Sequence, residues 1–68
     1  MTDREFVRRL RRYARERGLA VEHLPDRGKG SHAMIRLGTR TTTLSKGEIH
    51  PGRLHAMLRQ LEIDKRDF

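Results

Sequence analysis

A six-residue segment in the first half of the chain combines residue types that suit phosphate chemistry. It consists of Arg27, Gly28, Lys29, Gly30, Ser31 and His32. The two glycines let the backbone approach a ligand and turn its amides inward, and the two basic side chains add positive charge. The serine adds a hydroxyl, and the imidazole titrates near neutral pH. The segment fits a phosphate held beside a general acid or base, and it equally fits a hairpin loop that ends in a surface histidine.

A second histidine has two interpretations. If the hairpin pairs Leu24 with Ser31, His23 lies opposite His32 on one face of the sheet, and two imidazoles could divide the acid and base roles. A slip of one residue moves His23 to the other face, where it is a lone surface side chain. Both arrangements are compatible with the sequence.

The other two histidines are interpreted as structural residues without a chemical role. His50 precedes Pro51 and is interpreted as a weak helix cap, and His55 is expected to face solvent. The chain has no cysteine and no His-x-x-x-His spacing, so we predict neither a metal site nor a cofactor.

A second basic feature lies near the N-terminus. Arg8, Arg11, Arg12 and Arg15 follow helical i, i+3, i+4 and i+7 spacing, so they form one stripe. The stripe can be a solvated helix face, with Glu16 pairing Arg12 at i, i+4 spacing. Because acidic neighbours are few, it also fits contact with the phosphates of a polyanion.

The overall charge supports a polyanion partner. The chain of 68 residues has a net charge of +7, and residues 1–47 hold 12 basic against 5 acidic side chains. Thirteen of the basic residues are arginine, whose planar fork matches phosphate. No run of apolar residues is long enough to span a membrane, and the N-terminal residues lack an apolar signal region. We therefore expect an intracellular, cytoplasmic protein of one domain, residues 1–68.

Helical periodicity is clear at both ends of the chain. Residues 2–17 are predicted to form a helix that Thr2 and Glu5 cap and Gly18 ends. Its apolar stripe is formed by Phe6, Leu10, Tyr13 and Ala14, with Val7 beside them. A second helix is predicted to begin at Pro51, with a stripe of Leu54, Met57, Leu58 and Leu61. Asp64 is predicted to cap a last turn that ends at Phe68.

Three strands are predicted between the helices, at residues 19–24, 31–37 and 40–44. In the second strand, Ala33, Ile35 and Leu37 share one face, and Gly38-Thr39 suits a turn into the Thr-rich third strand. The order α-β-β-β-α predicts an α+β domain with a three-stranded antiparallel sheet and both helices on one face.

These features together resemble the HicA toxins of bacterial toxin–antitoxin pairs, nearly from end to end. The resemblance is carried by Gly18 after the first helix, by Gly30-Ser31-His32 at a loop-to-strand junction, and by Gly52-Arg53-Leu54. It continues through residues 58–63, Leu-Arg-Gln-Leu-Glu-Ile, to Asp67-Phe68. Arg53 stands where the family usually has Thr, and Glu62 where it usually has Gly.

The resemblance implies a fold like that of the double-stranded RNA-binding domain and a metal-independent ribonuclease that cleaves messenger RNA. It assigns the catalytic role to His32, with Gly30 and Ser31 as motif neighbours, and it implies an antitoxin partner of HicB type. Two other functions fit the same composition. One is a non-catalytic RNA-binding module, and the other is a module that docks an acidic protein through the arginine stripe.

Overall fold

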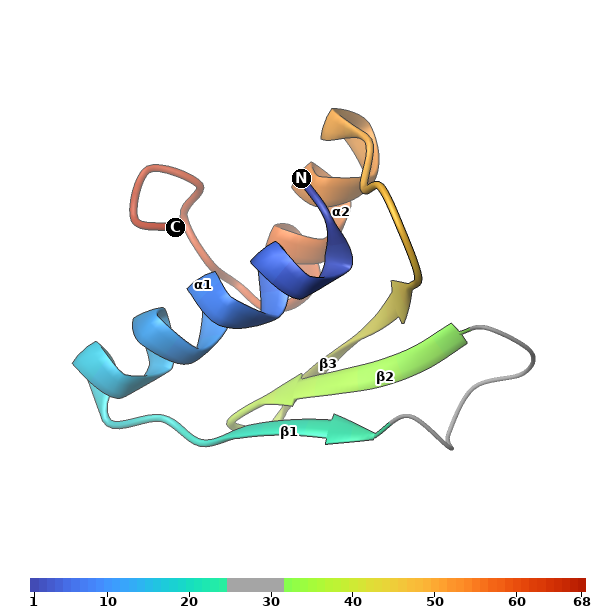
Figure 1. The fold of residues 1–68 in the computed structure, drawn as a ribbon. Helices are drawn as coiled ribbons and strands as arrows, with labels where there is room; N and C mark the ends of the chain where they lie inside the picture. Colours follow the sequence, from blue (N-terminus) through green and yellow to red (C-terminus); the bar gives the residue numbers. More distant parts are fainter. Residues whose placement is uncertain (25–31) are drawn as a thin grey trace.

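Two helices cover one face of a three-stranded antiparallel sheet (Figure 1). The computed structural model describes residues 1–24 and 32–68. Its elements are α1 (Asp3–Arg17), β1 (Val21–Leu24), β2 (His32–Leu37), β3 (Arg40–Ser45) and α2 (Pro51–Gln60). The predicted order α-β-β-β-α and the α+β layout are confirmed. No helix of the described residues has the length and apolarity needed to cross a membrane.

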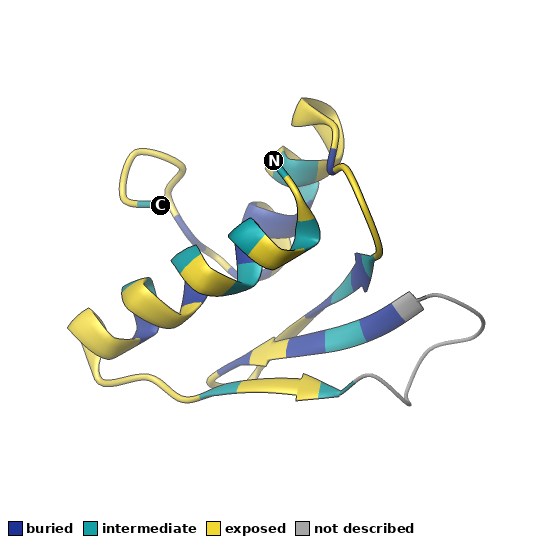
Figure 2. Cartoon of the chain, viewed as in Figure 1, coloured by how far each residue is buried: buried dark blue, intermediate teal, exposed yellow. Residues whose placement is uncertain are grey.

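The core forms where the apolar stripes of both helices meet the sheet. On α1, Phe6, Leu10 and Ala14 are buried, as their spacing predicts. They join one cluster whose other buried members are Ile35, Leu37, Leu44, Ile49, Met57, Leu58, Leu61 and Ile63. Residues far apart in the sequence therefore close a single core, and Figure 2 shows its buried positions turned toward the space between helices and sheet.

The central strand β2 pairs with both neighbours. A two-residue turn at Gly38-Thr39 joins it to β3, with Gly38 at φ 62°, a conformation that glycine adopts without a Cβ clash. The register pairs Leu37 with Arg40 across this turn and with Val21 of β1. Alternation then buries one face of β2 under the helices and leaves the other face open, as predicted.

Two predicted strand limits are wrong. The first strand begins at Val21 rather than residue 19 because the amide of Leu19 donates to the carbonyl of Ala14 at 2.9 Å and so terminates α1. The third strand continues to Ser45, where its pairing with β2 ends opposite His32.

Both helices end in the same hydrogen-bonded motif, a Schellman cap. In α1 the left-handed residue is Gly18, at φ 67°, as predicted. In α2 it is Glu62, at φ 56°, and the amide of Ile63 reaches back to the carbonyl of Leu58 at 2.8 Å. Glu62 thus occupies a backbone conformation that favours glycine, the residue usual here in the family that the chain resembles.

The two ends of the chain are held against the core. The carbonyl of Met1 accepts a hydrogen bond from the amide of Ile49 at 2.7 Å, and the Met1 ammonium pairs with Glu48. At the other end, Phe68 packs on Phe6 with ring centroids 5.2 Å apart. The last turn is capped by Asp64, as predicted.

The cap at Asp64 also affects its ionisation. The amide of Arg66 donates to the Asp64 carboxylate at 2.9 Å, and the Arg66 guanidinium pairs with it. These hydrogen bonds from Arg66 lower the pKa of the Asp64 carboxyl. Both side chains are exposed, so the pair shapes this turn rather than the core.

Glu62→Gly is expected to be about 1 kcal/mol more stable than Glu62→Ala, because alanine in a left-handed conformation places its Cβ against the backbone. Both variants lose the same side-chain contacts, so the comparison isolates the backbone. A thermal melt followed by circular dichroism should show midpoints about 4–8 °C apart. Arg59, inside α2, is the control, since there the alanine variant should be the more stable one. Equal midpoints for the two Glu62 variants would contradict the left-handed assignment.

Candidate nucleic-acid interface

A set of exposed arginines lies on the side of α1 that faces away from the core. Arg8, Arg11, Arg12 and Arg15 are all exposed, as their spacing predicts, and Figure 2 shows exposed and buried positions alternating along this helix. Arg4 is also exposed and lies one turn before Arg8. We call these five residues the arginine face. The spacing between Arg4 and Arg8 is the signal that could have added the fifth member from the sequence.

The charge of the arginine face is not neutralised within the described part of the chain. In residues 1–24 and 32–68, none of its members has an ion pair. The predicted pairing of Glu16 with Arg12 is absent from these residues, and Glu16 instead lies 3.9 Å from Arg17. Of the other two acidic residues of α1, Glu5 pairs with Arg9 at 3.4 Å, and Asp3 accepts a hydrogen bond from the amide of Gly47.

The arginine side chains border a shallow depression on the helix surface. It has a volume of about 420 Å³ and is lined by Arg8, Arg9, Arg12 and Arg15. Guanidinium groups donate hydrogen bonds in a plane and stay charged at any cellular pH. An anion that follows the axis of α1, such as a nucleic-acid backbone, would contact several of them in turn.

The predicted catalytic segment is only partly within the described residues. Arg27, Gly28, Lys29, Gly30 and Ser31 lie outside them, so their predicted roles stay predictions. His32 is the first residue of β2, as the loop-to-strand prediction requires, and the backbone register places it opposite Ser45. In Figure 1, this start of β2 and the C-terminal end of α1 lie at opposite ends of the sheet.

The predicted hairpin register that would place His23 opposite His32 is wrong. It required Leu24 to lie opposite Ser31, but Leu24 lies opposite Met34 and His23 opposite Ile35. His23 is exposed at the edge strand and belongs to the surface. A second acid or base for the reaction is therefore not supplied by a cross-strand partner of this kind.

The remaining histidines have positions that the sequence partly predicted. His50 is the N-cap residue of α2, but its side chain makes no capping hydrogen bond, so its predicted role as a cap is limited to the backbone. His55 is exposed on α2, as expected. Among the residues that the structure describes, no group of three or more His, Asp or Glu side chains is placed to hold a metal ion.

Arg53, on α2, contacts the backbone of a strand. The Arg53 guanidinium donates to the carbonyl of Thr43 at 2.7 Å, so this side chain connects α2 with β3. Arg53 therefore acts as a bridge between elements, whereas the arginine face has no ion pair within residues 1–24 and 32–68.

Comparisons with protein-family models, with curated proteins and with solved structures find no match to this chain. The family resemblance therefore stays a prediction.

Replacing Arg8, Arg11, Arg12 and Arg15 together with glutamine is expected to raise the thermal midpoint at low salt. Like charges at i, i+3 and i, i+4 spacing repel by a few tenths of a kcal/mol per pair, and glutamine has a similar helix propensity. The gain should shrink at high salt, where the repulsion is screened.

Arg9→Gln is the matched control, because it removes the ion pair with Glu5 and should lower the midpoint slightly. If the variant with all four arginines replaced melts below the wild type at low salt, these arginines make stabilising contacts within the chain.

Proposed function

We propose that this chain is a ribonuclease toxin of HicA type, which cleaves messenger RNA in the cytoplasm and is inhibited by a HicB-type antitoxin. The observation that carries the proposal is the arginine face of α1, whose exposed charges have no ion-pair partner within the described residues. Such a face suits a phosphate backbone, because neutralising phosphates releases condensed counterions. The family resemblance supplies the reaction class and the candidate catalytic residue.

In the proposed reaction, a base takes the proton of a ribose 2′-hydroxyl, and the oxygen attacks the adjacent phosphate. The bond from phosphorus to the 5′-oxygen breaks, and an acid returns a proton to that oxygen. His32 acts as the base or the acid, since an imidazole can hold or release a proton at cellular pH. Arg27 and Lys29 stabilise the added charge on the phosphoryl group, and the amides of Gly28 and Gly30 can do the same.

The arginine face has a different task in this proposal. Its side chains bind backbone phosphates away from the cleaved bond and so hold the RNA in place. Arg4 and Arg15 are eleven residues apart, which corresponds to about 16 Å along the helix axis. The face can therefore contact several successive phosphates, and its contribution to affinity should not depend on base sequence.

His32→Ala is expected to abolish RNA cleavage and growth arrest without changing RNA binding by more than about twofold, because the arginine face is intact. The measurement is induced expression, scored by growth and by messenger RNA integrity, together with cleavage of a labelled RNA by purified protein. His55→Ala is the control, since His55 is exposed on α2 and has no role in the proposed site.

Three results, the last from the same cleavage assay with a chelator added, would count against the proposal. Cleavage by His32→Ala at the wild-type rate would refute the catalytic assignment. Salt-sensitive binding without any product would identify a non-catalytic RNA-binding module. Loss of cleavage on adding a chelator would indicate a metal-dependent reaction instead.

Arg12→Gln is expected to weaken RNA binding and to flatten its salt dependence. Each phosphate contact that is lost lowers the slope of log affinity against log salt by about 0.7–0.9. Fluorescence anisotropy with a labelled RNA at several salt concentrations measures that slope. Arg66→Gln, on the C-terminal turn, removes the same charge and should leave the slope unchanged. Equal slopes for wild type and Arg12→Gln would exclude a phosphate contact at Arg12.

A further inference from the structure

A row of three residues crosses the sheet on the face that the helices leave open. The backbone register aligns Leu24 of β1 with Met34 of β2, and Met34 with Thr43 of β3. The residues next to this row along the strands, Ile35 and Leu44 among them, are buried, so alternation turns the row to the opposite face. In Figure 1 both helices lie on the other side of the sheet. We call Leu24, Met34 and Thr43 the open-face row.

Two members of the open-face row form a small apolar platform. Leu24 and Met34 are half-buried, although neither belongs to the core cluster or to the apolar side chains packed against it within the described residues. Side chains directly opposite each other on neighbouring strands are close enough to shield one another from water. The next row of the same face is polar, since it holds the ion pair of Glu22 with Arg36. The platform is therefore an isolated apolar spot on a polar surface.

The third member of the row adds a hydrogen-bond acceptor beside the platform. The Thr43 hydroxyl donates to the Sδ atom of Met34 at 3.6 Å, and the Thr43 carbonyl accepts from Arg53 at 2.7 Å. A hydroxyl has one proton and two lone pairs, so a hydroxyl that has donated its proton can still accept. The row thus offers a ligand an apolar surface with one oversized asymmetry: an acceptor oxygen at one end only.

The open-face row lies next to the residue proposed as catalytic. Met34 follows His32 by two positions in β2, which corresponds to about 7 Å along a strand. On β3, Thr43 precedes Ser45 by two positions, and the register places Ser45 opposite His32. A ligand bound to this row therefore lies within the length of one nucleotide from the start of β2.

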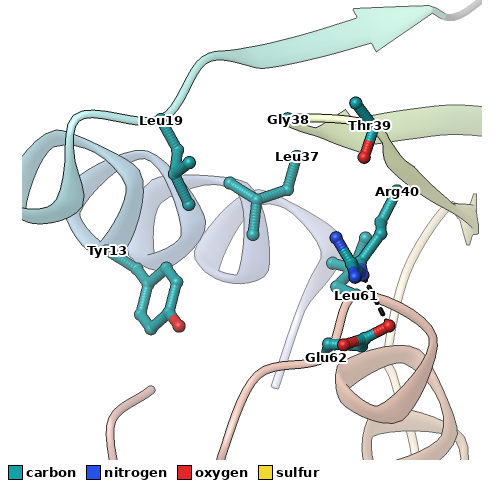
Figure 3. A pocket seen from close by; sticks show the side chains of 8 residues that line it. All are labelled: Tyr13, Leu19, Leu37, Gly38, Thr39, Arg40, Leu61 and Glu62. Carbon is teal, nitrogen blue, oxygen red and sulfur yellow. Dashed lines mark ion pairs between the residues drawn. The ribbon is translucent and has the colours of Figure 1, made fainter.

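The groove at the β2–β3 turn does not have this position. Figure 3 shows it between α1, the turn and the end of α2, with Leu19 and Leu37 in its lining and Arg40 paired with Glu62 at 2.7 Å. Leu37 ends β2 five residues after His32, about 17 Å along the strand. A group held in the groove is therefore far from a bond cleaved at the start of β2.

The size of the platform indicates what it binds. A standard protein–protein interface buries about 800 Å² on each partner, far more than two half-buried side chains next to an ion pair provide. A nucleobase is flat, with apolar faces and polar N–H groups at its edge. Thioether sulfur makes favourable contacts with aromatic rings, and the Thr43 oxygen matches a donor at the ring edge. A single base therefore fits the row better than a protein segment.

We propose that the open-face row binds one unpaired base of the RNA, adjacent to the cleaved bond. The ring packs on Met34 and Leu24, and an N–H group of the base donates to the Thr43 hydroxyl. This proposal rests on the proposed ribonuclease function, which supplies the substrate and the place of the cut. It adds that the RNA is single-stranded there, because a base inside a duplex has neither its face nor its pairing edge free.

The proposal defines the path of the RNA. The arginine face points away from the sheet, whereas the open-face row points away from the helices, so the two lie on opposite sides of the fold. A strand that contacts both has to bend around the end of the sheet at which β2 begins. Unpaired RNA bends in this way, because its bases are free to unstack and splay apart.

The test is a nuclear magnetic resonance titration of the isotope-labelled chain with a short single strand of 2′-O-methyl RNA. This strand lacks the attacking hydroxyl, so the result does not depend on cleavage. A second strand has the same phosphates but abasic sugars. We expect both strands to shift signals of the arginine face, and only the strand with bases to shift the methyl signals of Met34 and Leu24. Annealing that strand to its complement should remove the Met34 shift.

Thr43→Val removes the hydroxyl and keeps the shape and the strand propensity of the side chain. It should weaken binding of the strand with bases about fivefold, as expected for one lost hydrogen bond, and leave the affinity for the abasic strand unchanged. Thr41→Val is the matched control, because it makes the same change two positions away on the same face, opposite Arg36. It should leave both affinities unchanged.

Three results would overturn the proposal. The first is an equal Met34 shift with the two strands, and the second is an equal Met34 shift with single strand and duplex. The third is a Met34 shift that grows with protein concentration alone, which would show that a second copy covers this face. Failure of the wild type to cleave unmodified RNA would refute the ribonuclease function instead, and the titration would still decide whether the row binds a base.

Discussion

The structure depends on the burial of a narrow apolar stripe on α1. Only 34% of the residues are hydrophobic. On folding, a chain of this size buries about 60% of the surface that its unfolded form exposes. Phe6 and Leu10 are fully buried, and Phe68 returns from the far end of the chain to contact Phe6. Because the core takes only one side of α1, the rest of its surface is free to be charged. The arginine face is thus compatible with the fold because the hydrophobic stripe is confined to the other side.

Local signals were sufficient to predict the elements. The Thr2 hydroxyl accepts from the amide of Glu5 at 3.2 Å, Gly18 is left-handed, and Pro51 begins α2. Each of these depends on residues within one or two turns, so the sequence pattern carries the information directly. The stripe of Met57, Leu58 and Leu61 depends on the same short-range periodicity, and these three side chains are buried.

Long-range pairing was harder to predict. The pairing of Leu24 with Met34, rather than with Ser31, moves the partner three positions along β2, and an odd shift reverses the face on which His23 lies. Nothing within the strand sequences specifies that offset, because it depends on how the hairpin between them closes. The exposed positions of the arginines on α1 and the place of His32 at the start of β2 were therefore predictable, whereas the cross-strand neighbour of His23 was not.

Arg53 and Glu62, at which the chain differs from the family that it resembles, have structural explanations. Arg53 donates a hydrogen bond to the carbonyl of Thr43 and so joins α2 to β3. Glu62 adopts a left-handed backbone conformation, and its carboxylate forms an ion pair with Arg40. Glu62 lies near the turn between β2 and β3, whereas Arg53 contacts Thr43, which is two residues from Ser45, the residue opposite His32.

The uncompensated charge of α1 links stability to binding. Repulsion among neighbouring arginines raises the free energy of the folded chain, and a bound polyanion removes that repulsion. A ligand that binds only the folded state stabilises it, so any polyanion that binds the arginine face recovers part of this cost.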